Sequence, residues 1–203
     1  MTEQEAFWAS DFGDEYTERN DGMLLSNMSF FANILHRAPG IESILELGCN
    51  KGLNLLALDR IYETIDLTGI DVNEVALRQV FEQEWKKKPT VTKSSIAKYE
   101  DARRYDLVFT KGVLIHLNPD QLNDTYKKMY DLSNRYILIA EYYNPTPVEI
   151  EYRGNSGKLF KRDFAGEMLD LLPIKLIDYG FVYHRDKNPQ DDLHWFLFDK
   201  GGV

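Results

Sequence analysis

The stretch SILELGCNKG, residues 43–52, decides the fold of this chain. The apolar run 44–47 predicts a buried strand, Gly48 to Gly52 predicts a tight turn, and a leucine pattern typical of a helix follows. Glycine lets the backbone pass close to a ligand at positive φ, and asparagine is the next best tolerated residue, so Asn50 preserves the turn. The Glu46 carboxylate ends the strand beside this turn, where it is available to a positively charged amine. A tight strand-to-helix turn with no ligand is the alternative interpretation.

The segments around this stretch alternate short β-branched runs with longer helical patterns, which is typical of a parallel sheet with crossover helices. Asn118 as N-cap and Pro119 at the first helical position predict a helix that runs to about Leu132. The chain should therefore form an α/β fold, a mostly parallel seven-stranded sheet with an antiparallel C-terminal hairpin and helices on both faces. The expected strands are 44–47, 67–71, one near Val91, 106–109, 136–141, and an antiparallel pair at 176–183 and 195–199.

Length and composition indicate one soluble domain over residues 1–203. No segment approaches the run of about 18 apolar residues that a membrane span requires. The N-terminus lacks the basic and apolar regions of a secretory signal, so we expect a cytoplasmic protein without a membrane partner. The formal charge of −9 disfavours nucleic acid as a partner and favours a small molecule.

Within this domain we expect four regions: a helical cap at 1–40, a cofactor-binding core at 41–141, a substrate-side insertion with a helix at 142–173, and the hairpin at 174–203. Cys49 is the single cysteine, which excludes an internal disulfide. Because the histidines also lack metal-ligand spacing, no metal is expected.

A second carboxylate is predicted at the end of the strand 67–71, where Asp71 follows Thr68-Gly69-Ile70. At this position Asp71 can accept hydrogen bonds from both ribose hydroxyls of a nucleoside bound across the first turn, although it could equally cap the next helix. Val72 would then pack on the adenine face, with Ser95 and Ile96 at the adenine edge. A nicotinamide dinucleotide would require glycines at 50 and 53, where the chain has asparagine and leucine.

Four motifs occur here in the order of a known superfamily: ELGCNKG (46–52), GID (69–71), YDLVF (105–109) and GVLIHL (112–117). Over roughly residues 41–141 the chain resembles the class I S-adenosylmethionine (SAM) dependent methyltransferases. The N-terminal Phe7-Trp8 and DFGDEYTERN (11–20) resemble more narrowly a bacterial clade, the pseudaminic acid biosynthesis-associated methylases.

The resemblance implies a Rossmann-like methyltransferase fold, with SAM as cofactor and S-adenosylhomocysteine (SAH) as product. It also implies that the cofactor site includes Gly48, Cys49, Asn50 and Gly52. It also implies that Tyr16 and Arg19 close over SAM, since a guanidinium fork suits the SAM carboxylate. Lys111 would flank the methionine moiety through its backbone. For Arg19 the alternative is an exposed helix with an ion pair to Glu15 or Asp14.

The proposed general base is His116, which follows the strand 106–109 and can take a proton near neutral pH. Packing without a catalytic role is the alternative for this histidine. Glu141, Tyr142 and Tyr143 are rival polar groups at the same crevice.

The substrate-binding candidates are Tyr142, Tyr143, Glu149 and Arg153, and the last two lie in the chain's basic cluster between 149 and 162. This cluster suits a carboxylate or phosphate on the substrate, and a solvated loop is the alternative. We therefore expect an O-methyltransferase, less readily an N-methyltransferase, that acts on a sugar, nonulosonic acid or nucleotide-sugar in bacterial surface glycan biosynthesis. A methyltransferase for another small acidic metabolite, and a non-catalytic SAM-binding regulatory or scaffold subunit, remain alternatives. The sequence leaves the oligomeric state open.

Overall fold

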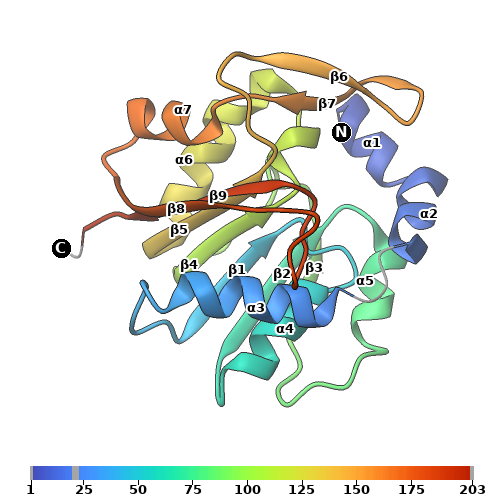
Figure 1. Ribbon diagram of the computed structural model, residues 1–203. Coiled ribbons are helices and arrows are strands. Elements are labelled where there is room, and N and C mark those ends of the chain that lie inside the picture. Colours follow the sequence, from blue (N-terminus) through green and yellow to red (C-terminus); the bar gives the residue numbers. More distant parts are fainter. Residues whose placement is uncertain (1, 20–22, 202–203) are drawn as a thin grey trace.

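The computed structural model describes residues 2–19 and 23–201, with the backbone alone for Glu18 and Arg19. Its centre is one sheet with the strand order β3-β2-β1-β4-β5-β9-β8 (Figure 1). β1 to β5 pair in parallel, and β9 is antiparallel to both β5 and β8. The expected mostly parallel seven-stranded sheet with an antiparallel C-terminal hairpin is thus confirmed. The strands are β1 (Ser43–Leu47), β2 (Asp66–Asp71), β3 (Thr90–Lys93), β4 (Tyr105–Lys111), β5 (Ser133–Glu141), β8 (Lys175–Val182) and β9 (Leu193–Asp199).

Helices cover both faces of this sheet (Figure 1). Apolar side chains of α3, α4 and α5 form the core on one face, and those of α6 and α7 form the core on the other. Along β4, Leu107 and Phe109 pack toward the first group while Val108 packs toward the second, as the two-residue period of a strand requires. The helices are α1 (Glu3–Trp8), α2 (Asp11–Arg19), α3 (Leu24–Leu35), α4 (Leu53–Ile61), α5 (Glu74–Val80), α6 (Leu122–Leu132) and α7 (Phe164–Leu171), with short 3₁₀ turns η1 (Leu114–His116) and η2 (Pro119–Gln121).

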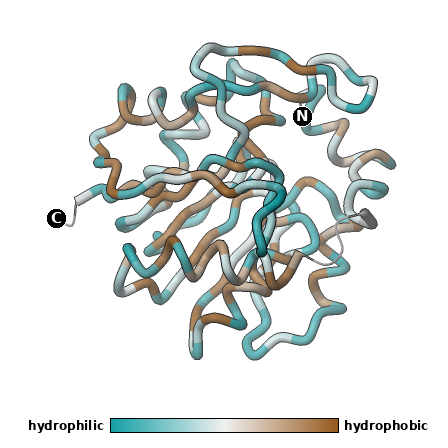
Figure 2. Tube along the Cα trace, viewed as in Figure 1, coloured by the Kyte–Doolittle hydropathy of each residue, from teal (hydrophilic) through white to brown (hydrophobic). Residues whose placement is uncertain are grey.

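Hydropathy follows this layering: the central strands are largely brown and the connecting loops largely teal in Figure 2. Within residues 2–19 and 23–201, no helix is both long enough and apolar enough to cross a bilayer.

The insertion after β5 contains a hairpin that the sequence reasoning missed. β6 (Val148–Tyr152) and β7 (Asn155–Lys161) pair antiparallel in a separate two-stranded sheet. Arg153 and Gly154 form its two-residue turn, with φ of 52° and 80°. A two-residue hairpin turn of this kind needs positive φ at both central residues. Because arginine is rarely found at positive φ, this turn carries no strong sequence signal.

The helix expected from Asn118 onward begins differently. The Asn118 side chain accepts a hydrogen bond from the backbone N–H of Asp120 (3.0 Å), so the predicted N-cap and the position of Pro119 are correct. The first turn, η2, is nevertheless 3₁₀, and the α-helix itself begins at Leu122.

The N-terminal cap, defined here as α1 and α2, lies across the carboxyl ends of the parallel strands (Figure 1). The Asn50 amide nitrogen donates to the Thr17 hydroxyl of α2 (2.9 Å). Asn73 donates from its side chain to the Trp8 carbonyl (3.2 Å) and to Asp14 (2.8 Å). Each of these contacts joins the cap to a loop that follows a central strand, so the cap closes the space above those loops.

Candidate active site

A cavity of about 630 Å³ lies between the carboxyl ends of the central strands and the cap. Its lining comes from the loops after β1, β2, β3 and β4, from both cap helices, and from the loop that joins β8 to β9. The strand order reverses between β1 and β4, and ligands of open α/β sheets bind at such a reversal, outside the carboxyl ends of the strands. The cavity therefore occupies the position expected for a cofactor.

The turn after β1 forms one wall of the cavity. Gly48 has φ of 84° and Asn50 has φ of 47°, so the predicted left-handed asparagine is present. The backbone N–H groups of Gly48 and Cys49 both donate to the Ile70 carbonyl (2.8 and 2.9 Å), which ties the turn to β2. A Cβ atom on Gly48 would lie 2.5 Å from a methyl group of Val113, so the turn has no room for a side chain there.

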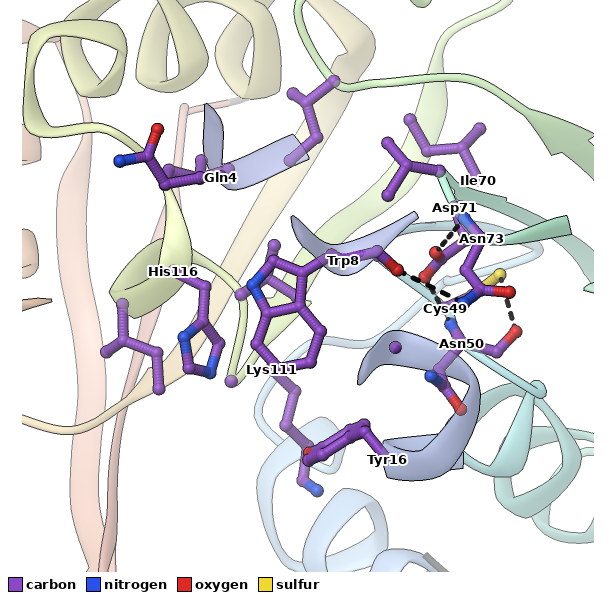
Figure 3. A pocket seen from close by; sticks show the side chains of 18 of the residues that line it. Gln4, Trp8, Tyr16, Cys49, Asn50, Ile70, Asp71, Asn73, Lys111 and His116 are labelled. Atoms are coloured by element: carbon purple, nitrogen blue, oxygen red, sulfur yellow. Dashed lines mark hydrogen bonds between the residues drawn. The ribbon is translucent and has the colours of Figure 1, made fainter. Parts of the chain in front are cut away.

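Asp71 ends β2 and faces the same cavity (Figure 3). Its carboxylate accepts hydrogen bonds from the backbone N–H groups of Asn50 (2.7 Å) and Asn73 (2.8 Å). The α5 helix is capped by Asn73, whose side chain accepts from Ala76 N (2.9 Å), so the alternative role of Asp71 as its N-cap is wrong. Burial raises the pKa of the Asp71 carboxyl. Each carboxylate oxygen has two lone pairs, so both retain acceptor capacity for a ligand.

Glu46 lies behind the cavity rather than in its described lining, because its side chain is fully buried. One carboxylate oxygen accepts from the Asn54 side-chain nitrogen (2.7 Å), and the other has no partner among the described residues. Burial raises the pKa of Glu46 to about 8. Asn54 does line the cavity, and its buried carbonyl oxygen has no hydrogen-bond partner in the described part of the chain. Glu46 thus orients the side chain of Asn54.

The expected adenine contacts also meet the cavity. Val72, Ser95 and Ile96 all line it, at the end where β2 and β3 terminate. The Ser95 hydroxyl is buried and, among the described residues, has no partner. An unpaired buried hydroxyl calls for a ligand or water partner, and a nucleobase edge supplies one. Gly52 lies outside the described lining and packs near Val80.

Lys111 ends β4 and lines the cavity, with its side chain extending toward Tyr16 in Figure 3. Burial lowers the pKa of its ammonium group to about 8, and the charges of Glu46 and Asp191 act in the opposite direction. The sequence reasoning gave this residue a backbone contact alone. The structure adds a positive charge beside the cavity.

His116, in η1, lines the cavity from the other side (Figure 3). Its Nδ1 lies 2.6 Å from the Lys158 carbonyl oxygen, which can only accept, so Nδ1 carries the proton and Nε2 keeps its lone pair. Burial lowers the pKa of His116 to about 4, so the ring is neutral near pH 7. The ring packs against Trp8 and Tyr152, with centroids 4.5 and 5.1 Å away. This tautomer is the one that a general base requires.

Glu141, considered a rival to His116, has a different position. Its carboxylate accepts from the backbone N–H groups of Val113 (3.1 Å), Leu114 (3.1 Å) and Ile115 (3.4 Å), at the start of η1. Burial raises its pKa to about 7. Glu141 therefore fixes the turn that carries His116 and lies outside the described lining of the cavity.

The four predicted substrate residues separate into two pairs. Tyr142 and Arg153 line the cavity. Tyr143 instead packs on His194 of β9, with ring centroids 5.4 Å apart, and the Glu149 carboxylate accepts from Gly157 N (2.5 Å) within the β6–β7 hairpin.

The basic cluster around Arg153 is also dispersed. Lys158 forms an ion pair with Glu3, and Arg162 forms one with Glu167 (2.5 Å). Lys161 lies over the Tyr142 ring, 5.0 Å from its centroid.

Of the two cap residues expected to close over the cofactor, Tyr16 lines the cavity and packs edge-on against Trp8 at 5.1 Å. The side chain of Arg19 lies outside the described residues. Trp8 itself lines the cavity, and its buried indole N–H has no described hydrogen-bond partner. From the sequence, Trp8 served only as part of the N-terminal stretch that resembles the methylase clade, and its position in the cavity was not predicted.

Gln190 and Asp191 also line the cavity and were missed. They come from the loop between β8 and β9, which returns to α3 where the Gln190 side chain donates to Asn27 (3.0 Å). Gln190 and Asn27 are 163 residues apart in the sequence, so no local sequence pattern predicts their contact.

These orphaned polar atoms test whether the expected cofactor fits. Three residues that line the cavity carry a buried polar atom without a described partner: the Trp8 indole N–H, the Asn54 carbonyl oxygen and the Ser95 hydroxyl. The Asp71 carboxylate and the Lys111 cation belong to the same lining. SAM carries a nucleobase, ribose hydroxyls, an ammonium group and a carboxylate, which match this set. The residues present therefore fit SAM.

Residues 44–135 match a protein-family model described as a methyltransferase domain. No curated protein matches the sequence. Many solved structures are similar. The magnesium protoporphyrin IX methyltransferase of Synechocystis PCC 6803 with bound SAM has a TM-score of 0.72 at 13% identity, covering 99% of each chain.

Two further structures have the same fold. The 1,6-didemethyltoxoflavin-N1-methyltransferase of Burkholderia thailandensis has a TM-score of 0.71 at 13% identity, covering 97% of this chain and 86% of its own. The plantazolicin methyltransferase in complex with SAH has a TM-score of 0.67 at 15% identity, covering 98% and 94%. Residues 44–135 therefore resemble a methyltransferase domain, and the chain has the fold of these methyltransferases around a cavity that fits SAM.

Proposed function

We propose that this chain is a SAM-dependent methyltransferase that transfers a methyl group to a hydroxyl oxygen of a small acidic sugar, a nonulosonic acid or a nucleotide-sugar, in the cytoplasmic assembly of bacterial surface glycans. The observation that carries the proposal is that His116, in the tautomer of a proton acceptor, and Arg153 line the same cavity. The sugar part of the proposal comes from the resemblance of the N-terminal stretch to the pseudaminic acid methylase clade.

In this proposal, residues at the carboxyl ends of β2, β1 and β4 would hold the cofactor. Asp71 would accept hydrogen bonds from the ribose hydroxyls, Ser95 would meet the adenine edge, and Tyr16 would cover the cofactor from the cap. The bound cofactor supplies a methyl group on a positively charged sulfur. Positioning the acceptor in line with that methyl group is the main requirement for transfer.

The acceptor would lie beneath the β6–β7 hairpin. Trp8 and Tyr152, with ring centroids 6.1 Å apart, supply apolar walls for a sugar ring, and the Arg153 guanidinium binds its carboxylate or phosphate. The reacting hydroxyl donates to Nε2 of His116, which takes the proton as the oxygen attacks. A pKa of about 4 makes this histidine a weak base but keeps it unprotonated throughout the neutral range.

The test is to incubate the protein with SAM and matched pairs of neutral and acidic sugars, and to search by mass spectrometry for the gain of one methyl group. We expect methylation of acidic sugars, and a KM for them that rises about 10- to 100-fold in Arg153→Gln with SAM affinity unchanged. Lys175→Gln removes a charge of the same sign from an exposed position at the start of β8, outside the described lining of the cavity, and is the control.

Other outcomes favour the alternatives. Methylation of non-sugar acids alone would support a methyltransferase for another small metabolite. SAM binding without turnover on any acceptor would support a regulatory or scaffold subunit. Equal turnover of neutral and acidic sugars would contradict the role of Arg153.

A further inference from the structure

Lys111 carries a charge in the cavity to which the proposed function gives no role. It ends β4, lines the cavity, and its ammonium nitrogen lies 5.8 Å from the centre of the Phe30 ring of α3. With the residues that the structure describes, this ammonium forms neither a hydrogen bond nor an ion pair. Burying a cation without a partner is costly. A negatively charged group of a ligand in the cavity would offset this cost for Lys111.

The charges around Lys111 restrict that ligand. Glu46 of β1, Asp191 of the β8–β9 loop and Glu141 of β5 all act electrostatically on its ammonium group. An ordinary anion in the cavity would meet the Asp191 carboxylate together with Lys111, and repulsion by Asp191 would offset the attraction of the anion to the lysine. A zwitterion places its negative group on the cation and its positive group toward the acceptors. The surroundings of Lys111 therefore suit a zwitterionic amino acid group.

The cavity gives this group a definite position. Asp71 and Ser95 lie at the ends of β2 and just after β3, whereas Asn54 and Lys111 follow β1 and β4. Because β1 lies between β2 and β4, a nucleoside held at Asp71 directs the rest of the molecule across the β1 turn toward Lys111. Figure 3 shows the Lys111 side chain directed toward Tyr16 and away from Asp71.

We propose that the Lys111 ammonium group binds the carboxylate of SAM, while the unpaired carbonyl oxygen of Asn54 accepts from its ammonium group. This inference rests on SAM being held by Asp71 as in the proposed function. It assigns the carboxylate to a residue of the central sheet, whereas the family resemblance assigned it to Arg19 in the cap. In this arrangement the methionine moiety is held at the carboxyl end of the central strand β4, independently of the position of the cap.

The experiment compares SAM with decarboxylated SAM, which lacks only the carboxylate, by isothermal titration calorimetry. Wild type should bind SAM about 10- to 100-fold more tightly than decarboxylated SAM, the size that a charge-assisted hydrogen bond contributes. Lys111→Met, of similar length without the charge, should lose most of this preference by weakening SAM alone. Lys111→Arg should retain it in part.

The matched control is Lys127→Met, which removes the same charge from an exposed position on α6 and should bind both compounds as wild type does. If Lys111→Met fails to fold, Lys111→Gln replaces it. Equal weakening of both compounds, or an unchanged preference for SAM, overturns the role of Lys111. Binding of neither compound by wild type refutes the SAM site itself, so the two failures are distinguishable.

Discussion

The buried Glu46 carboxyl makes the stability of the protein depend on pH in a way that one substitution removes. Burial raises its folded-state pKa from 4.5 to about 8. A carboxyl group with a raised folded-state pKa contributes stability that is fully present below pH 4.5 and is lost as the pH rises through 8. The loss over this window is about 5 kcal/mol, since each pKa unit corresponds to about 1.4 kcal/mol.

Glu46→Gln should abolish this pH dependence. The glutamine retains an oxygen that accepts from Asn54, and the cost of its buried amide group is the same at every pH. The free energy of unfolding of the variant, relative to wild type, should therefore rise by about 1.4 kcal/mol per pH unit between about pH 5 and pH 8.

The assay is urea-induced unfolding of both proteins, without SAM, at four values of pH across this window. Taking the difference between the two proteins cancels the titration of Glu141 and His116, which both contain. Glu42→Gln, which neutralises an exposed carboxylate directly before β1, is the control and should give a much smaller slope. A difference between Glu46→Gln and wild type that does not change with pH would refute the reasoning.

Three further predictions concern the cavity. His116→Gln should keep SAM affinity and lower kcat by about 10²- to 10⁴-fold, measured by turnover and calorimetry; an unchanged kcat removes His116 as the base. Glu141→Gln replaces an acceptor of three N–H bonds, so η1 should shift and kcat should fall while SAM affinity is kept; loss of SAM affinity instead would contradict this role. Gly48→Ala places a Cβ 2.5 Å from Val113 and should destabilise the protein by about 1–3 kcal/mol more than Gly40→Ala, which has similar φ but no atom within 4 Å; equal losses in thermal unfolding would contradict the close approach.

Local sequence signals were enough to predict most of the fold. The turn after β1, with Gly48 and a left-handed Asn50, lies within ten consecutive residues, and each apolar strand is a short continuous run. Such features depend on neighbours in sequence, so they are readable without the tertiary structure. The same holds for the Asn118 cap.

The site was harder to predict from the sequence, because its contacts join residues that are far apart in the chain. Glu46 and Asn54 share one hydrogen bond, but which of them faces the cavity depends on how β1 is packed. The Lys158 carbonyl that fixes the His116 tautomer comes from β7, after the hairpin turn at Arg153 that has no typical turn residue in its first position. Burial also changes the chemistry of Lys111, and burial is a property of the fold rather than of the motif.

The central claim is that the cavity at the end of the parallel strands binds SAM through Asp71, and a thermal-shift measurement with SAM, SAH and NAD tests it most directly. Wild type should be stabilised by SAM and SAH but not by NAD. Asp71→Ala should lose this stabilisation, whereas Asp66→Ala, at the opposite end of β2, should keep it. Stabilisation by NAD alone, or an undiminished response of Asp71→Ala to SAM, would contradict the claim.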